Sequence, residues 1–600
     1  MKSPNFDTRS APLRTIFSPS NLEKIWTTKV RVYMRQQFLN DGIEHLDFHV
    51  ARKAECQKLS RLILAGDYVP ERAQRILVEK SKGLCRQLVI PSVKDAIVLQ
   101  CLSDALYTEV KGKEPTKCAF FEPKNHKFSI QKSQYGSIPA WLNFQRELFN
   151  FSANRNYIVV TDISNYYDSI SYTHLRNVIS AISGVEECVL DMLIHVLSSL
   201  LWQPDYMPRV EIGLPQMNLD APRLLAHCFL YELDKFLASD PNRDFVRFMD
   251  DIDVGVDRIS DAKQVLKAMD LVLQTKQVRL NSGKTLILRK DAAAKHFRIF
   301  QNSQLDKLTE NIALKVASGK QITVEVARIE KAVSSGLAKK SFDHGNGDKV
   351  LKRWINLAAK TGAILDTEDL KRVFLNRPSV RENVCSYIMR SDFSISLAKM
   401  AAECARSPLL VDDAGRVDLV NYLLEALVPR KGKRHDHIMR VQAACDVQTY
   451  FGLYCKMWLQ SKYDTTQALL DTIQATQALW ASHERMGRLV GSFSPLFADI
   501  AEKSSYYTLI NQAVNHGVRD VSRFHDALAN DPNVFNSMYD SLKATNPSRG
   551  TGITHPKFLC LLSALKNKAV PPTQIATLKN NHVLAWKDAY YSDIAKRLSI

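Results

Sequence analysis

The sequence predicts an α+β protein: a first half that mixes helices with short strands, followed by a large all-α region. Segments near residues 157–161 and 244–256 carry the short valine and isoleucine runs that are typical of strands. After about residue 305 strand signals almost vanish, and apolar residues recur at helical spacing. At 600 residues the chain is too long for one core, so we expect two to four domains.

The first 75 residues are expected to form a helical segment, which includes the basic stretch TKVRVYMRQQF. The next stretch, GLCRQLVIPSVKDAIVLQCLSDAL, predicts a strand, an Ile-Pro step and a helix. Its strand carries Arg86, whose planar guanidinium suits phosphate oxygens, and Lys82 is a weaker candidate for the same role. A solvent-exposed strand arginine is the alternative interpretation.

The segment DFVRFMDDIDVGV predicts two strands joined by a turn that contains Asp250 and Asp251. Adjacent carboxylates at a hairpin tip repel each other, so a cation is their natural partner. Oxygen ligands of this kind suit Mg²⁺. Alone, the pair is weak evidence, because acidic turns are commonly solvated.

Other segments surround this hairpin in a definite order. Upstream, YIVVTDISNYYDSI predicts a strand that runs into Asp162 and a polar turn with Tyr167. Then GLPQMNLDAPRLLAHCF predicts a Gly/Pro turn with Gln216, followed by a helix. After the hairpin come a helix and VRLNSGKTLIL, in which Lys284 lies just beyond a glycine-containing turn.

This order resembles motifs A, B, C and D of the reverse-transcriptase palm, at Asp162, Pro215-Gln216, Asp250-Asp251 and Lys284. The Arg86 segment resembles the fingers of the same family. The resemblance covers about half the chain and implies right-hand polymerase fingers and palm over residues 76–304. It also implies a nucleotidyltransferase that uses deoxynucleoside triphosphates.

In that family two Mg²⁺ ions would be held by Asp162 and Asp250, with Asp251 assisting, in an in-line displacement. Asp168 and Asp253 have no obvious family role, and we expect them to be solvated or to cap turns.

The resemblance assigns four nucleotide contacts. Arg86 would reach the triphosphate and Gln216 the nucleotide. Tyr167 would pack under the sugar and exclude a 2′-hydroxyl, unless it is a core residue. Lys284 would protonate the leaving pyrophosphate, unless it is merely solvated.

Motif B departs from the family pattern. The common glycine after Pro-Gln is Met217 here, and the common serine before the next proline is Ala221. Glycine permits close approach of backbone to a ligand, whereas a methionine side chain fills that space. The departure places ordinary template copying in doubt.

Residues 305–600 predict a stack of antiparallel helices that is HEAT-like. The run Pro429–Arg434 suggests an internal boundary near 430. Its positive charge could contact nucleic acid, but a solvated linker is the better explanation, because short basic runs are common in loops.

A palm followed by a long helical domain resembles the Abi (abortive infection) reverse transcriptases of bacterial phage defence. That resemblance implies template-independent DNA synthesis, primed by a protein hydroxyl that stays attached to the product, and a homo-oligomer. Tyr33 is one possible primer. The alternative is a conventional RNA-templated enzyme of the retron type.

A second activity is suggested by Arg519 and His525, whose spacing fits the pattern of HEPN ribonucleases within residues 435–600. The pair could polarise an RNA 2′-hydroxyl and stabilise the scissile phosphate, as an RNA-cleaving toxin would require. A polar helix surface is the competing interpretation.

Composition is consistent with a nucleic-acid enzyme. The net charge is +18 and the pI about 9.3, which favours a polyanionic partner. Eleven cysteines without a CxxC pair suggest reduced thiols. No apolar run has the length of a membrane span and no signal peptide is evident, so we expect a cytoplasmic protein without a membrane partner.

Overall fold

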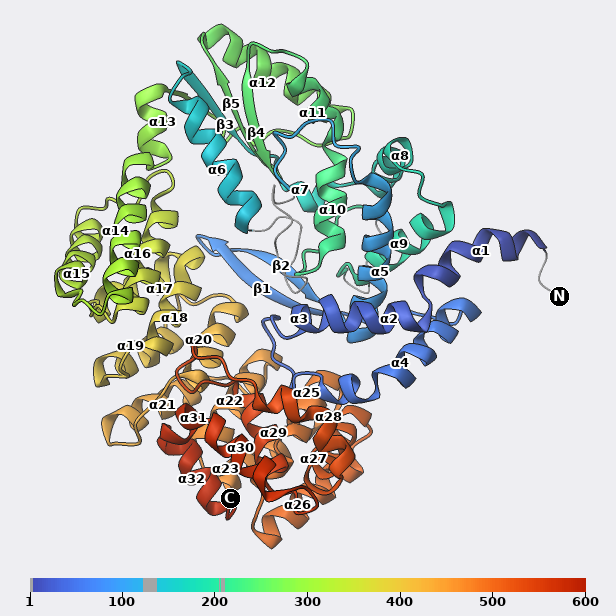
Figure 1. Ribbon diagram of the computed structural model, residues 1–600, viewed down its shortest axis with the longest axis vertical. Coiled ribbons are helices and arrows are strands. Elements are labelled where there is room, and N and C mark those ends of the chain that lie inside the picture. The colour runs from blue at the N-terminus through green and yellow to red at the C-terminus, as the bar shows by residue number, and fades with distance from the viewer. Residues whose placement is uncertain (1–3, 122–137, 204–205, 207–210) are drawn as a thin grey trace. The chain divides into compact units, whose positions relative to one another are not determined.

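The computed structural model describes residues 4–121, 138–203, 206 and 211–600 (Figure 1). The fold is α+β and mostly helical, as predicted. The chain forms two compact units. The first comprises Met1–Gln37, Arg52–Ile76 and Gln87–Phe300, and the second comprises Phe38–Ala51, Leu77–Arg86 and Gln301–Ile600.

The first unit is built on a four-stranded antiparallel sheet in the order β4-β5-β3-β6. Its strands are β3 (Tyr157–Thr161), β4 (Asp244–Phe248), β5 (Asp251–Val256) and β6 (Leu286–Arg289). Helices connect β3 to β4 and β5 to β6, while β4 and β5 form a hairpin. This is the β-α-β-β-α-β topology of the ferredoxin-like group.

Helices cover both faces of this sheet (Figure 1). On one face, Phe144 and Phe151 of α6 (Ile138–Ser152) join Ile158 and Val246 in an apolar cluster. On the other, α12 (Ile259–Gln274) packs on β3 and β5. Gly255 allows α6 to approach closely, because a Cβ atom there would lie 2.8 Å from the Phe151 ring.

The remaining helices of the first unit surround this core. They are α1 (Pro4–Ile16), α2 (Pro19–Ile25), the π-helical turn Trp26–Val30, α3 (Arg31–Met34), α5 (Val93–Val110), α7 (Tyr166–Ser169), α8 (Tyr172–Ile182), α9 (Glu187–Leu200), α10 (Asp220–Phe229), α11 (Tyr231–Ala238) and α13 (Lys290–His296).

The predicted Arg86 strand forms a hairpin with the strand before it: β1 (Gln74–Ser81) and β2 (Leu84–Ile90). Lys82 and Gly83 form its two-residue turn with φ of 53° and 80°, as a type I′ turn requires. The tip of the hairpin groups with the second unit. There Arg381 pairs with both Glu79 and Asp412, and all three side chains are nearly buried.

The second unit is entirely helical apart from this tip. Within it, α16 (Gly347–Thr361) packs on α18 (Arg381–Arg390), α18 on α20 (Asp413–Glu425) and α20 on α22 (Tyr450–Tyr463). Likewise α17 (Thr367–Asn376) packs on α19 (Ile395–Arg406) and α19 on α21 (Lys433–Ala443). Contacts between alternate helices are typical of a stack of helix pairs, as the sequence predicts. Assignment to the HEAT type remains a prediction.

The helices of the second unit are α14 (Ile299–Ala317), α15 (Thr323–Ala338), α16 (Gly347–Thr361), α17 (Thr367–Asn376), α18 (Arg381–Arg390), α19 (Ile395–Arg406), α20 (Asp413–Glu425), α21 (Lys433–Ala443), α22 (Tyr450–Tyr463), α23 (Thr466–Ala475), α24 (Gln477–Ala481), α25 (Glu484–Ser492), α26 (Ile500–Gln512), α27 (His516–Asn530), α28 (Pro532–Lys543), α29 (His555–Leu565), α30 (Pro572–Asn581), α31 (Val583–Lys587) and α32 (Ala589–Arg597), with short 3₁₀ turns at Pro378–Val380 and Ser494–Leu496.

The structure divides the chain differently from the predicted boundaries at 75 and 430. Residues 38–51 join the helical unit, where Arg488 pairs with Asp41 and Asp47. The helix α4 (Leu46–Ala65) therefore crosses the division. Position 430 lies inside the second unit, because α21 continues the helix stack beyond it. Only the boundary near 304 corresponds closely to a division of the structure.

No helix within the described ranges is both long and apolar enough to cross a membrane. All eleven cysteines are unpaired thiols.

Candidate active site

Three aspartates gather at one end of the four-stranded sheet. In the β3–β5 ladder Thr161 pairs with Ile252, so the same register continued by one residue places Asp162 opposite Asp251. Asp250 lies in the two-residue turn between β4 and β5, because Phe248 pairs with Asp251. The structure thus brings together residues that are 88 positions apart in the sequence.

The turn has an unusual backbone. Met249 has φ of 56°, a left-handed conformation that is uncommon for a residue with a side chain. Such conformations persist only where surrounding structure enforces them, and they concentrate at functional sites. Here the carbonyl of Met249 accepts a hydrogen bond from Arg247 Nη1 at 2.9 Å.

Arg247 belongs to a buried ion pair that the sequence analysis missed. Its Nε donates to Asp234 Oδ1 at 2.7 Å and its Nη2 to Oδ2 at 2.5 Å, and both side chains are fully buried. Nη2 also lies 3.3 Å from Nδ1 of His227, whose pKa burial holds well below its ordinary value. A neutral imidazole can accept this hydrogen bond. The arginine therefore ties the hairpin turn to α10 and α11.

Lys284 is held beside Asp162 by the chain that returns from α12. The amide of Asn281 donates to the Asp162 carbonyl at 2.9 Å, and the hydroxyls of Thr161 and Thr285 lie 2.7 Å apart. Lys284 Nζ then lies 2.5 Å from Asp162 Oδ2. This hydrogen bond raises the pKa of Lys284, so the ammonium stays charged.

Lys284 pairs with one of the three carboxylates, that of Asp162. Burial raises the pKa of Asp250 to about 6, and the Asp251 and Asp162 charges act in the same direction. Asp162 is 9% exposed, and its Oδ1 has no hydrogen-bond partner among the described residues. Repelling carboxylates with a buried, unpartnered oxygen are suitable donors for a divalent cation.

Over residues 4–121, 138–203, 206 and 211–600, no three His, Cys, Asp or Glu side chains already surround one point as metal ligands. In this structure Lys284 engages Asp162 Oδ2, and Asp251 is exposed to solvent. The donor types and their charges suit Mg²⁺.

The two predicted tyrosines have different surroundings. Tyr166 is 3% exposed and donates its hydroxyl hydrogen bond to the Ala226 carbonyl, so it is a core residue. Tyr167 is half-buried, and burial raises its pKa, with further influence from Arg223 and Asp250. Burial and the charge of Asp250 raise the pKa of both tyrosines, and the two rings differ in their exposure to solvent.

The motif B residues are mostly held by protein contacts. The Gln216 carbonyl accepts from the Val89 amide at 2.8 Å, and its side-chain nitrogen lies 3.5 Å from Asp168 Oδ1. Met217 and Ala221 are buried, 8% and 1% exposed. The methionine thus occupies protein interior.

Asp168 and Asp253 are both expected from the sequence to be solvated or to cap turns, and the structure shows different environments for them. Asp168 is exposed, as expected for a solvated residue. Asp253 is only 5% exposed, so the expectation that it is solvated or caps a turn is wrong: it lies in mid-strand, paired with Val160 and Val246.

Arg86 is exposed near the hairpin tip and belongs to the helical unit rather than to the unit that contains the aspartates. Its contact with a triphosphate remains a prediction, as does that of Lys82, which is exposed in the turn.

Arg519 and His525 both lie on α27, but the structure does not bring them together. Arg519 Nη2 lies 2.9 Å from Nδ1 of His516 near the surface. His525 is 2% exposed, its Nδ1 lies 2.9 Å from Ser563 Oγ, and burial lowers its pKa to about 3. A neutral histidine in the helical core is poorly placed for acid–base chemistry on RNA.

Tyr33 is similarly enclosed: it is 5% exposed and its hydroxyl donates to Asp220 Oδ2 at 3.0 Å. In this conformation the hydroxyl is not accessible as a primer.

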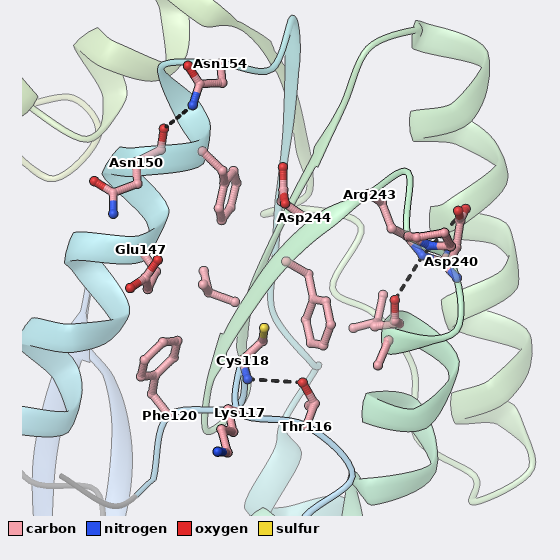
Figure 2. Close-up of a pocket in the computed structure, with 16 residues that line it drawn as sticks. Thr116, Lys117, Cys118, Phe120, Glu147, Asn150, Asn154, Asp240, Arg243 and Asp244 are labelled. Carbon is pink, nitrogen blue, oxygen red and sulfur yellow. Dashed lines mark hydrogen bonds and ion pairs between the residues drawn. The ribbon is translucent and has the colours of Figure 1, made fainter. Parts of the chain in front are cut away.

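A cavity of about 620 Å³ lies against β4, lined by residues that include Asn150, Asp240 and Arg243 (Figure 2). It contacts Asp244–Val246, at the opposite end of the strand from the aspartates. It is therefore separate from the candidate active site.

No protein-family model matches the chain. Over 206 residues it is 26% identical to "Protein YkfC" of Escherichia coli (strain K12), a match that covers 33% of this chain and 49% of that protein. The chain thus spans about half the length of this curated relative.

Among solved structures, the chain is similar to telomerase from Candida albicans in complex with a TWJ fragment of telomeric RNA. The TM-score is 0.28 at 9% identity, over 69% of this chain and 71% of that one. It is also similar to apo telomerase from Candida tropicalis, with a TM-score of 0.27 at 12% identity, over 76% and 73% of the two chains. Similarities this low support no inference about fold or activity.

Proposed function

We propose that this chain is a Mg²⁺-dependent nucleotidyltransferase of the reverse-transcriptase type that extends DNA from deoxynucleoside triphosphates. One observation carries the proposal: Asp162, Asp250 and Asp251 meet at one end of an antiparallel sheet, with Lys284 beside them. Clustered carboxylates that raise one another's pKa, on a left-handed turn held by a buried arginine, suit a metal-assisted phosphoryl transfer.

In this proposal each side chain of the site has a separate role. Asp162 and Asp250 would hold two Mg²⁺ ions, with Asp251 assisting; when bound, the metals supply charge stabilisation for the attacking and leaving oxygens. Tyr167 would contact the sugar. Lys284, released from Asp162, would carry a proton within reach of the pyrophosphate oxygens.

The finer proposal is an Abi-type enzyme of antiphage defence that works without a template, primes on its own hydroxyl and forms a homo-oligomer. Its support is the buried Met217 and Ala221 in motif B and the helix-pair stack after the palm. The retron-like alternative, templated by RNA, shares the same chemistry and differs in its requirement for nucleic acid. The ribonuclease alternative is disfavoured by the burial of His525.

The test is nucleotide incorporation by purified protein stripped of nucleic acid, with Mg²⁺, labelled deoxynucleotides and neither template nor primer. A denaturing gel before and after protease would reveal label that is attached to protein. The matched control is Asp257→Asn, which removes an exposed carboxylate near the opposite end of β5, where it pairs with Arg155.

Protein-linked label that is lost in Asp250→Asn and kept in Asp257→Asn supports the full proposal. Incorporation that appears only when RNA or a primed template is added supports the retron-like alternative. No incorporation under either condition contradicts the polymerase assignment itself.

A further inference from the structure

A second pocket, of about 420 Å³, lies within the helical unit and is lined by three cations: Lys360, Arg390 and Arg549. Its other lining residues are small, apolar or hydroxylic, and none is acidic. We propose that this pocket binds phosphate, with the backbone of a single nucleic-acid strand as the expected source. The proposal is independent of the palm, because it concerns binding and not nucleotide addition.

The charge of the pocket is largely uncompensated. Within the described residues, neither Lys360 nor Arg390 forms an ion pair with a carboxylate, while Arg549 pairs with Glu425. Like charges around one space repel, and an anion between them relieves that repulsion. The volume lies within the range of ordinary ligand pockets, roughly 300–1,000 Å³.

The cavity beside β4 provides a contrast within the same chain. It contains Lys117 and Arg243, but also the carboxylates Glu147, Asp240 and Asp244 (Figure 2). A mixed lining of this kind offers no preference for an anion. The cationic lining is therefore not a general feature of cavities in this basic protein.

The loop that contributes Arg549 is fixed before any ligand arrives. Asn546 Oδ1 accepts from the amide of Ser548 at 3.1 Å and from its hydroxyl at 2.6 Å, and the Ser548 carbonyl accepts from Arg390 Nε at 3.1 Å. At Gly550 a Cβ atom would lie 2.8 Å from the Met389 carbonyl oxygen. Preorganised cations lose less conformational entropy when they bind an anion.

Lys360 lies in the last turn of α16, and Arg390 ends α18. Cations at helix C-termini also offset the helix dipole, which is the competing explanation for these two residues. That explanation predicts an effect of their removal on stability and none on phosphate binding. It also leaves unexplained why Arg549, from a loop, lines the same space.

The experiment measures fluorescence anisotropy of a 5′-labelled single-stranded oligodeoxynucleotide with full-length protein across a salt series, without nucleotides. The test variant is Lys360→Gln/Arg390→Gln. The control is Lys399→Gln/Arg523→Gln, which removes one lysine and one arginine that are exposed elsewhere in the same unit and paired with Glu403 and Asp520. Thermal unfolding of both variants verifies that each is folded.

We expect the test variant to bind the oligonucleotide more weakly. The slope of the logarithm of the binding constant against log[salt] should become less negative by roughly 1.4, since each of the two lost single-strand phosphate contacts contributes about 0.7. The control should keep the wild-type slope. A second outcome is that all three proteins show the same salt slope for the oligonucleotide, while inorganic pyrophosphate raises the unfolding temperature of the wild type and the control but not of the test variant. In that case the source of the bound phosphate is free phosphate. If the two double variants behave alike in both arms, the proposal is overturned.

Discussion

Two clusters of charged residues flank the β4–β5 hairpin. One stabilises the hairpin turn, and the other is the candidate catalytic site. Arg247 faces one side of the sheet, where Asp234 satisfies it with two hydrogen bonds and no solvent reaches either group. On the other side Asp162 and Asp251 lie near Asp250, and Lys284 pairs with Asp162. In the first cluster the two charges neutralise each other, and the ion pair stabilises the turn. In the second, burial and the charges of Asp251 and Asp162 raise the pKa of Asp250, a perturbation that is common at functional sites.

The largest expected effect is the loss of activity when a carboxylate of the second cluster becomes an amide. Asp162→Asn and Asp250→Asn should each abolish nucleotide incorporation, because a metal ligand is lost. The measurement is incorporation of labelled deoxynucleotide with Mg²⁺, alongside Asp257→Asn. Measurable activity in either variant would contradict the assignment of Asp162 and Asp250 as the metal ligands of a polymerase palm.

Next in size is the response of the first cluster to the loss of one partner. Asp234→Asn should lower the free energy of unfolding by about 3–5 kcal/mol, because Arg247 is left buried and without its counter-ion. Urea unfolding followed by circular dichroism measures this. A loss below about 1 kcal/mol would mean that solvent reaches the pair.

The matched double variant Asp234→Leu/Arg247→Met replaces the pair with apolar groups of similar size. It should recover much of the stability, since both buried charges are gone. Activity should remain reduced, however, because Met249 also loses the hydrogen bond from Arg247 that supports the turn. Recovery of full activity together with stability would show that Arg247 has no positioning role.

The sequence predicted the second cluster and missed the first, for physical reasons. Asp162, Asp250, Asp251 and Lys284 follow strands or turns in a recognisable order, so their meeting at one sheet end follows from the pattern. The Arg247 ion pair depends on which helix packs behind the hairpin, and that is decided by tertiary structure. The one available signal was an arginine inside an apolar strand, FVRFMDD.

The same distinction applies to the domains. Helical periodicity predicted the helix stack, whereas ion pairs such as Arg488 with Asp41 join segments hundreds of residues apart and carry no local signal. His525 shows the converse: its spacing from Arg519 suggested a ribonuclease pair, but spacing alone does not reveal that it faces the helical core.

A smaller effect concerns stability without metal. The pKa of Asp250 is raised to about 6 in the folded protein, above the ordinary value near 3.8, so its ionised form costs stability above pH 6. Asp250→Asn should therefore stabilise the metal-free protein by about 1–2 kcal/mol at pH 8, given about 1.4 kcal/mol per pKa unit and partial solvent screening.

That gain should shrink as the pH falls from 6 toward 4, because the wild-type carboxyl becomes protonated and no longer repels its neighbours. Thermal unfolding in chelator at several pH values measures it. Asp257→Asn is the control with opposite sign, since the Arg155 guanidinium lowers the pKa of Asp257 and stabilises its charged form. If the stability of the two variants changed with pH in the same way, repulsion from neighbouring carboxylates would not be what raises the pKa of Asp250.

The smallest expected effect compares the adjacent tyrosines, Tyr166 in the core and Tyr167 half-buried. Tyr167→Val should raise the use of ribonucleotides relative to deoxynucleotides by about tenfold, a change of about 1.4 kcal/mol that is typical of altered packing against one substrate group. Tyr166→Val should lower stability, because its buried hydroxyl bond to Ala226 is lost, and leave sugar preference unchanged. Competition between the two nucleotide types in one reaction measures the ratio directly. An unchanged ratio in Tyr167→Val would mean that this ring is not the sugar gate and that selectivity arises elsewhere in the site.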